Sequence, residues 1–293
     1  MNTNRDIFKR DYYLTDGGIE TCLIYQHGIQ LNHFASFELL NYAEGMRALK
    51  KYYLPYMKLA IENDLGFILE TPTWRDNQDW GAELGYSAGD LEKINKNAVF
   101  FMRSLIDKLG YSSDRFVVSG NVGPRADGYV VDQVMTPDEA KVYHQKQIQW
   151  LAYADADVVT ALTMTNSNEA IGVVNAAKYF GIPVVISFTV ETDGRLPSGE
   201  LLADAIQEVD LQTSWYACHY MINCAHPYHF MDVLKGAGYW KRRIKGIRAN
   251  ASCKSHEELD ASDSLDAGDK KQLARDYRAL AELLPDLRVI GGC

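Results

Sequence analysis

The chain has 293 residues, of which 47% are hydrophobic and 24% are charged, an ordinary balance for a protein with a large buried core. Its 30 basic and 39 acidic residues give a formal net charge of −9. The charges are spread along the chain, which argues against nucleic acid or an anionic membrane surface as a partner, because both require a basic patch.

Targeting and membrane signals are not evident in the sequence. Residues 1–11 are mostly polar and charged and contain no apolar signal-peptide core. No stretch approaches the ~20 apolar residues that are needed to cross a bilayer. The five cysteines are too sparse for a disulfide scaffold, so we expect a reducing, cytoplasmic location.

Four apolar runs of strand length occupy the first half of the chain, each followed by a segment of helical periodicity. In chain order, strands are predicted at 12–18, 65–71, 115–120 and 157–162, and helices at 46–63, 91–109, 136–154 and 167–180. Gly110 and Gly181 follow two of these helices as C-terminal caps. Thr136 opens a capping box at the start of a third. Pro55 lies inside the first helix and predicts a kink or a later start.

The same alternation continues to the end of the chain. Strands are predicted at 182–188, 218–224, 244–250 and 287–293, and helices at 199–212, 228–235 and 270–284. Ser255 offers a weaker capping box before the last of these helices. No Pro/Gly-rich linker or change of composition divides the units, so we expect one domain over residues 1–293.

Eight apolar strands alternating with helices predict an α/β fold, the (β/α)8 TIM barrel. Near-continuous apolar runs are typical of parallel strands that are buried on both faces. An open doubly wound sheet is the alternative, although its Gly-x-Gly-x-x-Gly fingerprint does not follow the first strand. The sequence stops at the end of the eighth strand, so the eighth helix is missing from it. We expect the natural polypeptide to continue, or this chain to be only its ordered part.

Barrel enzymes build their sites where the strands end. The residues predicted at this edge are Asp16, Gly17, Gly18, Glu70, Thr71, Gly120, Asn121, Leu162, Thr163, Ser187, Phe188, Asn223, Cys224, Asn250, Gly292 and Cys293. The two thiols of this set, Cys224 and Cys293, suggest a sulfur-rich zinc site with an open position for substrate. Zinc would hold a substrate thiol as the nucleophilic thiolate. The alternative is that both cysteines are buried filler.

Five short motifs occur in order along the chain. They are Asp16-Gly17-Gly18 with Thr21, Gly120-Asn121-Val122-Gly123-Pro124, Ser187-Phe188, Asn223-Cys224 and Gly291-Gly292-Cys293. In order and approximate spacing, over residues 12–293, they resemble the homocysteine S-methyltransferase family. Asn-Cys together with Gly-Gly-Cys is the most specific pair.

The resemblance implies a zinc-dependent methyltransferase of methionine biosynthesis that methylates homocysteine or a related small thiol. It implies Cys224 and Cys293 as catalytic residues and zinc ligands. It implies that Asp16, with the backbone of Gly17 and Gly18, helps to bind the amino-acid end of the substrate. The other predicted substrate-binding residues are Thr21, Glu70, Thr163 and Asn223. Family members usually carry a second cysteine directly after the position of Cys293, which this sequence does not show, and Cys253 is the candidate substitute.

One position departs from the family pattern. The family commonly has Glu-Thr at the end of strand four, where the glutamate meets the substrate ammonium, and the matching pair here is Leu162-Thr163. Loss of that carboxylate removes a charge-assisted hydrogen bond worth about 1.5–3 kcal/mol. The candidate replacements are Glu70, where relatives tend to be uncharged, and Glu191 after strand five.

The chain contains no corrinoid- or folate-binding module, which favours a cationic methyl donor. S-methylmethionine and S-adenosylmethionine are the favoured donors, and betaine comes next. Trp74, Trp80 and Tyr86 are candidates for the wall of the donor pocket. For the histidines around Cys224, which are His219, His226 and His229, packing or loop surface is favoured over a ligand role.

Two other hypotheses fit the same sequence. A divergent barrel of this family that only binds a ligand is favoured by Leu162 and by the missing third cysteine. A lyase-type barrel enzyme would use Asp16 and Glu70 as acid and base. Zinc content, thiol methylation and the residues that follow Cys293 in the natural gene distinguish the three.

Overall fold

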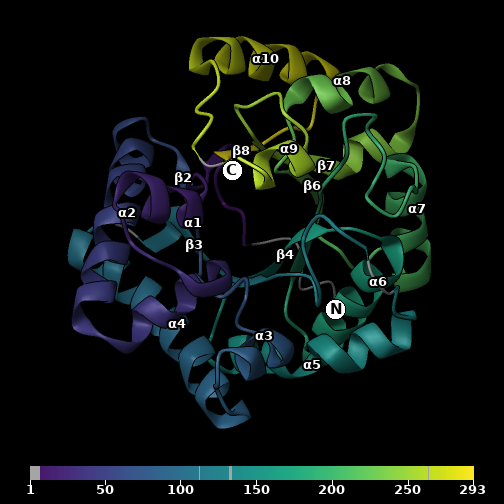
Figure 1. Cartoon of the computed structure of the whole chain (residues 1–293). Helices are drawn as coiled ribbons and strands as arrows, with labels where there is room; N and C mark the ends of the chain where they lie inside the picture. The colour runs from purple at the N-terminus through teal and green to yellow at the C-terminus, as the bar shows by residue number, and fades with distance from the viewer. Residues whose placement is uncertain (1–6, 112, 132–133, 263) are drawn as a thin grey trace.

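Eight parallel strands form a closed barrel in the computed structural model, which describes residues 7–111, 113–131, 134–262 and 264–293. The strands follow one another in chain order, and β8 pairs with β1 to close the barrel (Figure 1). They are β1 Tyr13–Leu14, β2 Gly66–Glu70, β3 Phe116–Val122, β4 Val158–Met164, β5 Val184–Phe188, β6 Tyr220–Asn223, β7 Ile244–Ala249 and β8 Val289–Gly292. This confirms the predicted TIM barrel and excludes the open sheet.

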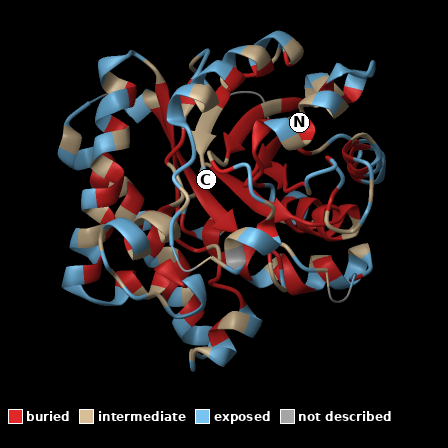
Figure 2. Cartoon of the chain, turned by 45° about the horizontal axis from the view of Figure 1, so that its top comes forward, coloured by how far each residue is buried: buried red, intermediate tan, exposed pale blue. Residues whose placement is uncertain are grey.

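Helices surround the strands, with their inner faces buried and their outer faces exposed (Figure 2). The α-helices are α1 Ile19–Thr21, α2 Ala43–Glu62, α3 Gln78–Glu83, α4 Ala88–Leu109, α5 Pro137–Tyr153, α6 Ser167–Phe180, α7 Leu202–Thr213, α8 Pro227–Lys235, α9 His256–Asp260 and α10 Lys270–Leu283. Shorter helical turns are Cys22–Gln26, Asn32–Phe34, Ser36–Asn41, Ser113–Arg115 and Tyr239–Arg243. Within the described residues, no helix has the length and apolar character to cross a membrane. The last element is β8, with no helix after it.

Local signals in the sequence explain most helix ends. Gly110 and Gly181 adopt left-handed φ values of 67° and 69° and end α4 and α6 as predicted. Thr136 forms its capping box at the start of α5. The expected later start at Pro55 is wrong, because α2 begins at Ala43 and continues through this proline. Pro55 is exposed, so water can satisfy the carbonyl that its missing N–H leaves unpaired.

The barrel interior changes from apolar to polar toward the C-terminal ends of the strands. The apolar layer consists of Tyr13, Ile68, Val117, Val158, Val185, Met221 and Val289. Side chains two positions apart in a strand point to the same face, and the next inward positions are Thr15, Glu70, Ser119, Thr160, Ser187 and Asn223. β7 adds Arg248 to this buried polar layer. The fold therefore collects polar groups at the edge where the sequence predicts a site.

Candidate active site

One cavity of about 640 Å³ opens at the C-terminal ends of the strands. This volume lies within the range that small-molecule sites occupy. The predicted site residues all line it, namely Asp16, Gly17, Gly18, Thr21, Glu70, Thr163, Asn223, Cys224 and Cys293. Two other candidates, Cys253 and Glu191, are not among the described residues that line it.

Cys224 and Cys293 meet at this cavity. They lie 69 positions apart in the sequence, and their sulfurs form a disulfide with a Cα–Cα distance of 5.2 Å. Reduction of this bond would expose two thiols side by side. Thiolate sulfur suits zinc in kind, but a catalytic zinc site normally uses three protein ligands. No group of three His, Cys, Asp or Glu side chains is placed to hold a metal within the described part of the chain.

The Asn223 side chain connects the sulfur of Cys224 to Thr163 and Ser187. Its Nδ2 donates hydrogen bonds to Cys224 Sγ at 3.0 Å and to Thr163 Oγ1 at 2.9 Å. Its Oδ1 accepts from Thr163 N at 3.0 Å and from Ser187 Oγ at 2.6 Å. Thr163 and Cys224 both adopt left-handed φ values, 61° and 60°. Such strained backbone persists where the surroundings fix it, and it clusters at functional sites.

Gly18 and Gly291 allow the residues after β1 to lie close to β8 and Cys293. A Cβ on Gly18 would lie 2.9 Å from the carbonyl carbon of Cys293. A Cβ on Gly291 would lie 1.8 Å from Thr15 Oγ1. Any side chain at these positions would displace the backbone beside Cys293. The Asp-Gly-Gly and Gly-Gly-Cys motifs are therefore in direct contact.

Arg248 binds the backbone of both motifs. Its Nη2 donates to Asp16 Oδ1 at 2.7 Å and to Gly17 O at 3.1 Å, and its Nε donates to Gly292 O at 3.3 Å. The other oxygen of Asp16 accepts from Tyr52 at 2.9 Å. Burial raises the pKa of Asp16, and Arg248 and Tyr52 oppose this effect. Both carboxylate oxygens of Asp16 already have protein partners, and its contact with substrate stays a prediction.

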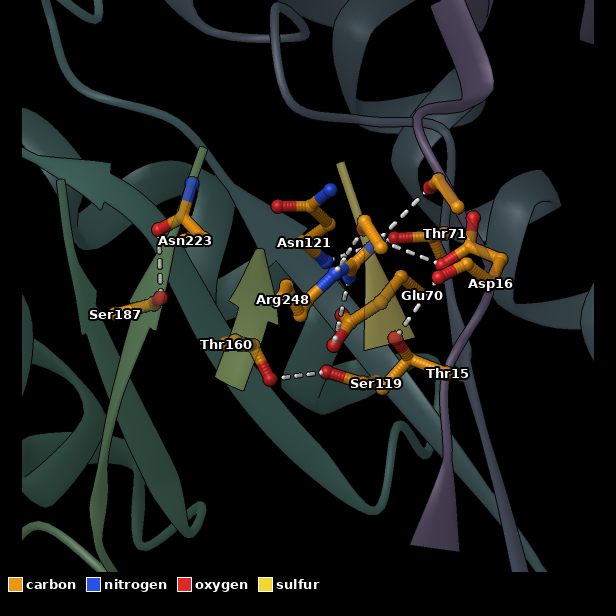
Figure 3. A network of polar contacts seen from close by, with 12 residues as sticks. Thr15, Asp16, Glu70, Thr71, Ser119, Asn121, Thr160, Ser187, Asn223 and Arg248 are labelled. Atoms are coloured by element: carbon orange, nitrogen blue, oxygen red, sulfur yellow. Dashed lines mark hydrogen bonds and ion pairs between the residues drawn. The ribbon is translucent and has the colours of Figure 1, made fainter. Parts of the chain in front are cut away.

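Glu70 ends β2 inside the barrel and is 2% exposed. Its Oε1 lies 3.9 Å from Arg248 Nη1 (Figure 3). Its Oε2 has no hydrogen-bond partner among the described residues. Burial raises the pKa of Glu70 to about 7, although Arg248 and the hydroxyls of Ser119 and Thr160 lower it. A buried carboxylate with an open oxygen is a candidate for contact with a cationic group.

Leu162 and two tryptophans add apolar and aromatic surface to the cavity lining. Leu162 packs with the inner apolar cluster, and its carbonyl accepts from Trp74 Nε1 at 3.4 Å. The guanidinium of Arg75 lies 4.2 Å from the Trp74 ring and 4.1 Å from the Trp80 ring. Both tryptophans line the cavity. Tyr86 is not among the described residues that line it and packs elsewhere, with Phe37.

The histidines near Cys224 have packing and capping contacts. His226 Nδ1 accepts from Tyr228 N at the start of α8. His219 is buried, and its ring lies 5.2 Å from that of Phe8.

Arg248 is a residue of the cavity that was not predicted from the sequence. One signal in the sequence could have identified it. Arg248 stands in an apolar strand that is predicted to be buried, and a buried arginine is almost always paired with another charged residue.

The comparisons with known proteins agree with one another. The family model for homocysteine S-methyltransferase matches residues 13–293. The chain is 25% identical over 240 residues to Homocysteine S-methyltransferase 1 of Brassica oleracea var. italica, which covers 75% of this chain and 70% of that protein. It is 22% identical over 241 residues to Homocysteine S-methyltransferase 1 of Arabidopsis thaliana, with 76% and 71% covered.

Two solved structures show the same fold. They are crystal structures of the homocysteine methyltransferase MmuM from Escherichia coli. The oxidized form has a TM-score of 0.77 at 19% identity, covering 100% of this chain and 95% of that one. The metallated form has a TM-score of 0.75 at 18% identity, covering 97% and 92%. Because the family model matches nearly the whole chain, the protein belongs to the homocysteine S-methyltransferase family.

Proposed function

We propose that the protein is a cytoplasmic methyltransferase that methylates the thiol of homocysteine or a related small thiol. The observation that supports this most is the meeting of Cys224 and Cys293 in a cavity of substrate size. The proposed donor is S-methylmethionine or S-adenosylmethionine, with betaine next. The residues lining the cavity include five carboxylates and three Lys or Arg side chains, an excess of negative charge that favours a cationic donor.

In the reduced protein, Cys224 and Cys293 would supply two sulfur ligands to a zinc ion. Bound zinc keeps an acceptor thiol deprotonated at neutral pH. Asn223 supports this role because its amide donates to Cys224 Sγ, and a hydrogen bond to sulfur favours the thiolate. Cys224 and Cys293 would fill two of the three protein positions that a catalytic zinc usually has.

The proposed reaction is a direct displacement. The acceptor sulfur forms a new bond to the methyl carbon, and the bond from that carbon to the cationic sulfur or nitrogen of the donor breaks. The electron pair stays with the donor, which leaves as a neutral group, and the acceptor's thiol proton goes to solvent. The chain's part is to hold both molecules in line inside the cavity.

The ligand-binding barrel remains the second candidate, because Leu162 replaces a carboxylate at the end of β4. The lyase hypothesis has less support. Asp16 would have to act as acid or base, and both of its oxygens are engaged by Arg248 and Tyr52.

Metal content and activity test the proposal together. Reduced protein should bind about one zinc and convert homocysteine to methionine with one of the proposed donors. Cys224→Ala and Cys293→Ala should lose both properties, and Cys253→Ala, whose cysteine is exposed and outside the cavity lining, should keep both. Methyl transfer by metal-free Cys224→Ala protein would show that the proposal is wrong.

A further inference from the structure

We propose that the amino-acid end of the acceptor binds across Glu70, Asn121 and Arg248. The α-ammonium would then be recognised from β2 and β3, and the α-carboxylate from β7. This inference takes the identity of the acceptor, homocysteine, from the proposed function. It assigns the recognition of the ammonium in a chain where strand four ends in Leu162.

Five buried polar atoms of residues that line the cavity have no hydrogen-bond partner among the described residues. Two of them, Arg75 Nε and Trp80 Nε1, belong to residues that follow β2 and stack on each other. The other three belong to residues of barrel strands. They are Glu70 Oε2, Asn121 Oδ1 and Arg248 Nη1. Their residues are 2%, 6% and 5% exposed, and all three line the cavity. Buried polar groups are normally paired in a folded protein. Three open positions on one cavity therefore indicate where a polar ligand belongs.

Neighbouring polar groups of the same cavity are already satisfied. Asp16 has partners on both oxygens, and Asn223 uses both its oxygen and its nitrogen. The hydroxyl of Thr71 accepts from Asn121 N at 2.9 Å. These groups would have to give up protein contacts in order to bind a ligand. The unpaired atoms of Glu70, Asn121 and Arg248 have no hydrogen bond to give up, and Arg248 Nη1 has only the 3.9 Å ion-pair contact with Glu70 Oε1.

The three open positions match a zwitterion. Glu70 Oε2 and Asn121 Oδ1 are acceptors and suit an ammonium, whereas Arg248 Nη1 is a donor and suits a carboxylate. Figure 3 shows Glu70 and Arg248 meeting inside the barrel with Asn121 beside them. Arg248 would repel a lone ammonium, and Glu70 would repel a lone carboxylate. An amino acid carries both charges, so its ammonium can contact Glu70 while its carboxylate contacts Arg248.

This position also lies next to the two cysteines. The side chain of Arg248 donates to Gly292 O, directly before Cys293. The backbone carbonyl of Arg248 accepts from Cys224 N at 3.0 Å. Arg248 therefore contacts the backbone of Cys224 and the residue before Cys293, which places the proposed anchor beside both cysteines. Leu162 lines the same cavity and offers an apolar contact to the methylenes.

Binding of two matched thiols tests the inference. Homocysteine and 4-mercaptobutanoate share the thiol, the chain length and the carboxylate, and only homocysteine has the ammonium. Calorimetry on the reduced, zinc-supplied protein should show a preference for homocysteine. In Glu70→Gln this preference should fall about tenfold or more, because only homocysteine loses a charged partner. Any contribution of metal to thiol binding is the same for both ligands and cancels.

Glu20→Gln is the matched control. Glu20 lines the same cavity, and Ser36 Oγ already donates to it at 2.7 Å. This variant should keep the wild-type preference. The inference is wrong if the wild type binds both thiols equally, or if Glu20→Gln loses the preference and Glu70→Gln keeps it. Should Glu70→Gln fail to unfold cooperatively, Glu70→Asp replaces it and should reduce the preference in the same direction.

The inference and the proposed function can fail separately. A Glu70-dependent preference without methyl transfer would support the ammonium site and contradict the enzyme. Methyl transfer with an unchanged preference in Glu70→Gln would contradict the ammonium site alone.

Discussion

Arg248 and Asp16 are 232 positions apart in the sequence, and a 2.7 Å hydrogen bond joins them inside the barrel. Their residues are 5% and 2% exposed. The same guanidinium binds the carbonyls of Gly17 and Gly292. One arginine therefore links β7 to the glycine motif after β1 and to the glycine before Cys293. The position of Cys293 depends on this buried pair.

Removing one member of the pair should destabilise the fold strongly. Asp16→Ala leaves Arg248 buried without its main partner, and we expect a loss of about 3–5 kcal/mol in the free energy of unfolding. Urea denaturation measures this loss. Asp79→Ala, which breaks a half-exposed pair with Arg125, should cost at most about 1 kcal/mol. Equal losses of stability in the two variants would contradict a stabilising role of the buried pair of Asp16 and Arg248.

Glu70 should make the stability depend on pH. Its pKa is raised to about 7 in the folded state, whereas the ordinary value is 4.5. Between these values the folded state holds a proton that the unfolded chain has lost, so stability falls as pH rises through this range. The difference between these two pKa values corresponds to about 3 kcal/mol at most in the free energy of unfolding. Arg248 and Asp16, the charged groups around Glu70, act in opposite directions on this pKa.

Glu70→Gln should remove that loss. Chemical denaturation at pH 5 and pH 8 would give the wild type a larger decrease in stability over this interval than the variant. An identical decrease in both proteins would show that Glu70 titrates normally in the folded state.

Asn223→Ala should impair the site more than it impairs the fold. The variant removes the donor to Cys224 Sγ and both contacts to Thr163. Supporting residues of metal ligands are typically worth about 10–100-fold in activity or metal affinity. We expect a loss of methyl transfer in this range and slower alkylation of Cys224 in the reduced protein. Site-resolved mass spectrometry separates Cys224 from the other cysteines.

Ser187→Ala is the control for Asn223. It removes a single contact to Asn223 Oδ1 and should have a smaller effect on both readouts. A larger effect of Ser187→Ala would mean that Asn223 does not act through Cys224 and Thr163.

Gly291→Ala should destabilise the protein because its new methyl group would overlap Thr15 Oγ1. Overpacking of this kind costs about 1–3 kcal/mol. At Gly89, near the start of α4, a new Cβ meets only Ser87 Oγ at 3.8 Å, and Gly89→Ala should be neutral or stabilising. Thermal unfolding of both variants checks the comparison. A neutral Gly291→Ala would contradict the close contact between β8 and the residues after β1.

Strand and helix periodicity was enough to predict the barrel, because β2 to β6 are buried along their whole length and most of their residues are apolar. The helix Ser167–Phe180 has the bounds that the sequence predicts, since its cap and its final glycine are both strong local signals. β1 is only two residues long, Tyr13–Leu14, against seven expected. The glycines that follow Leu14 approach β8 without continuing the ladder.

The buried charges could not be derived in the same way. Asp16 and Glu70 stand at predicted strand ends. Their partner Arg248 lies in β7, more than half the length of the chain away from both of them. Pairing between distant strands depends on closure, which periodicity does not describe. Likewise, Tyr52 contacts Asp16 from α2 because of helix packing, and no local pattern marks it.

In the proposed function, this barrel transfers a methyl group to a thiol through a site that needs both cysteines. The most direct measurement incubates reduced, zinc-supplied protein with backbone-labelled homocysteine and a methyl-labelled S-methylmethionine, and follows by mass spectrometry the methionine that carries both labels. Methionine that carries both labels is expected from the wild type and none from Cys224→Ala or Cys293→Ala. The proposed function is wrong if neither this donor, S-adenosylmethionine nor betaine passes its label to the thiol, or if both variants transfer it at the wild-type rate.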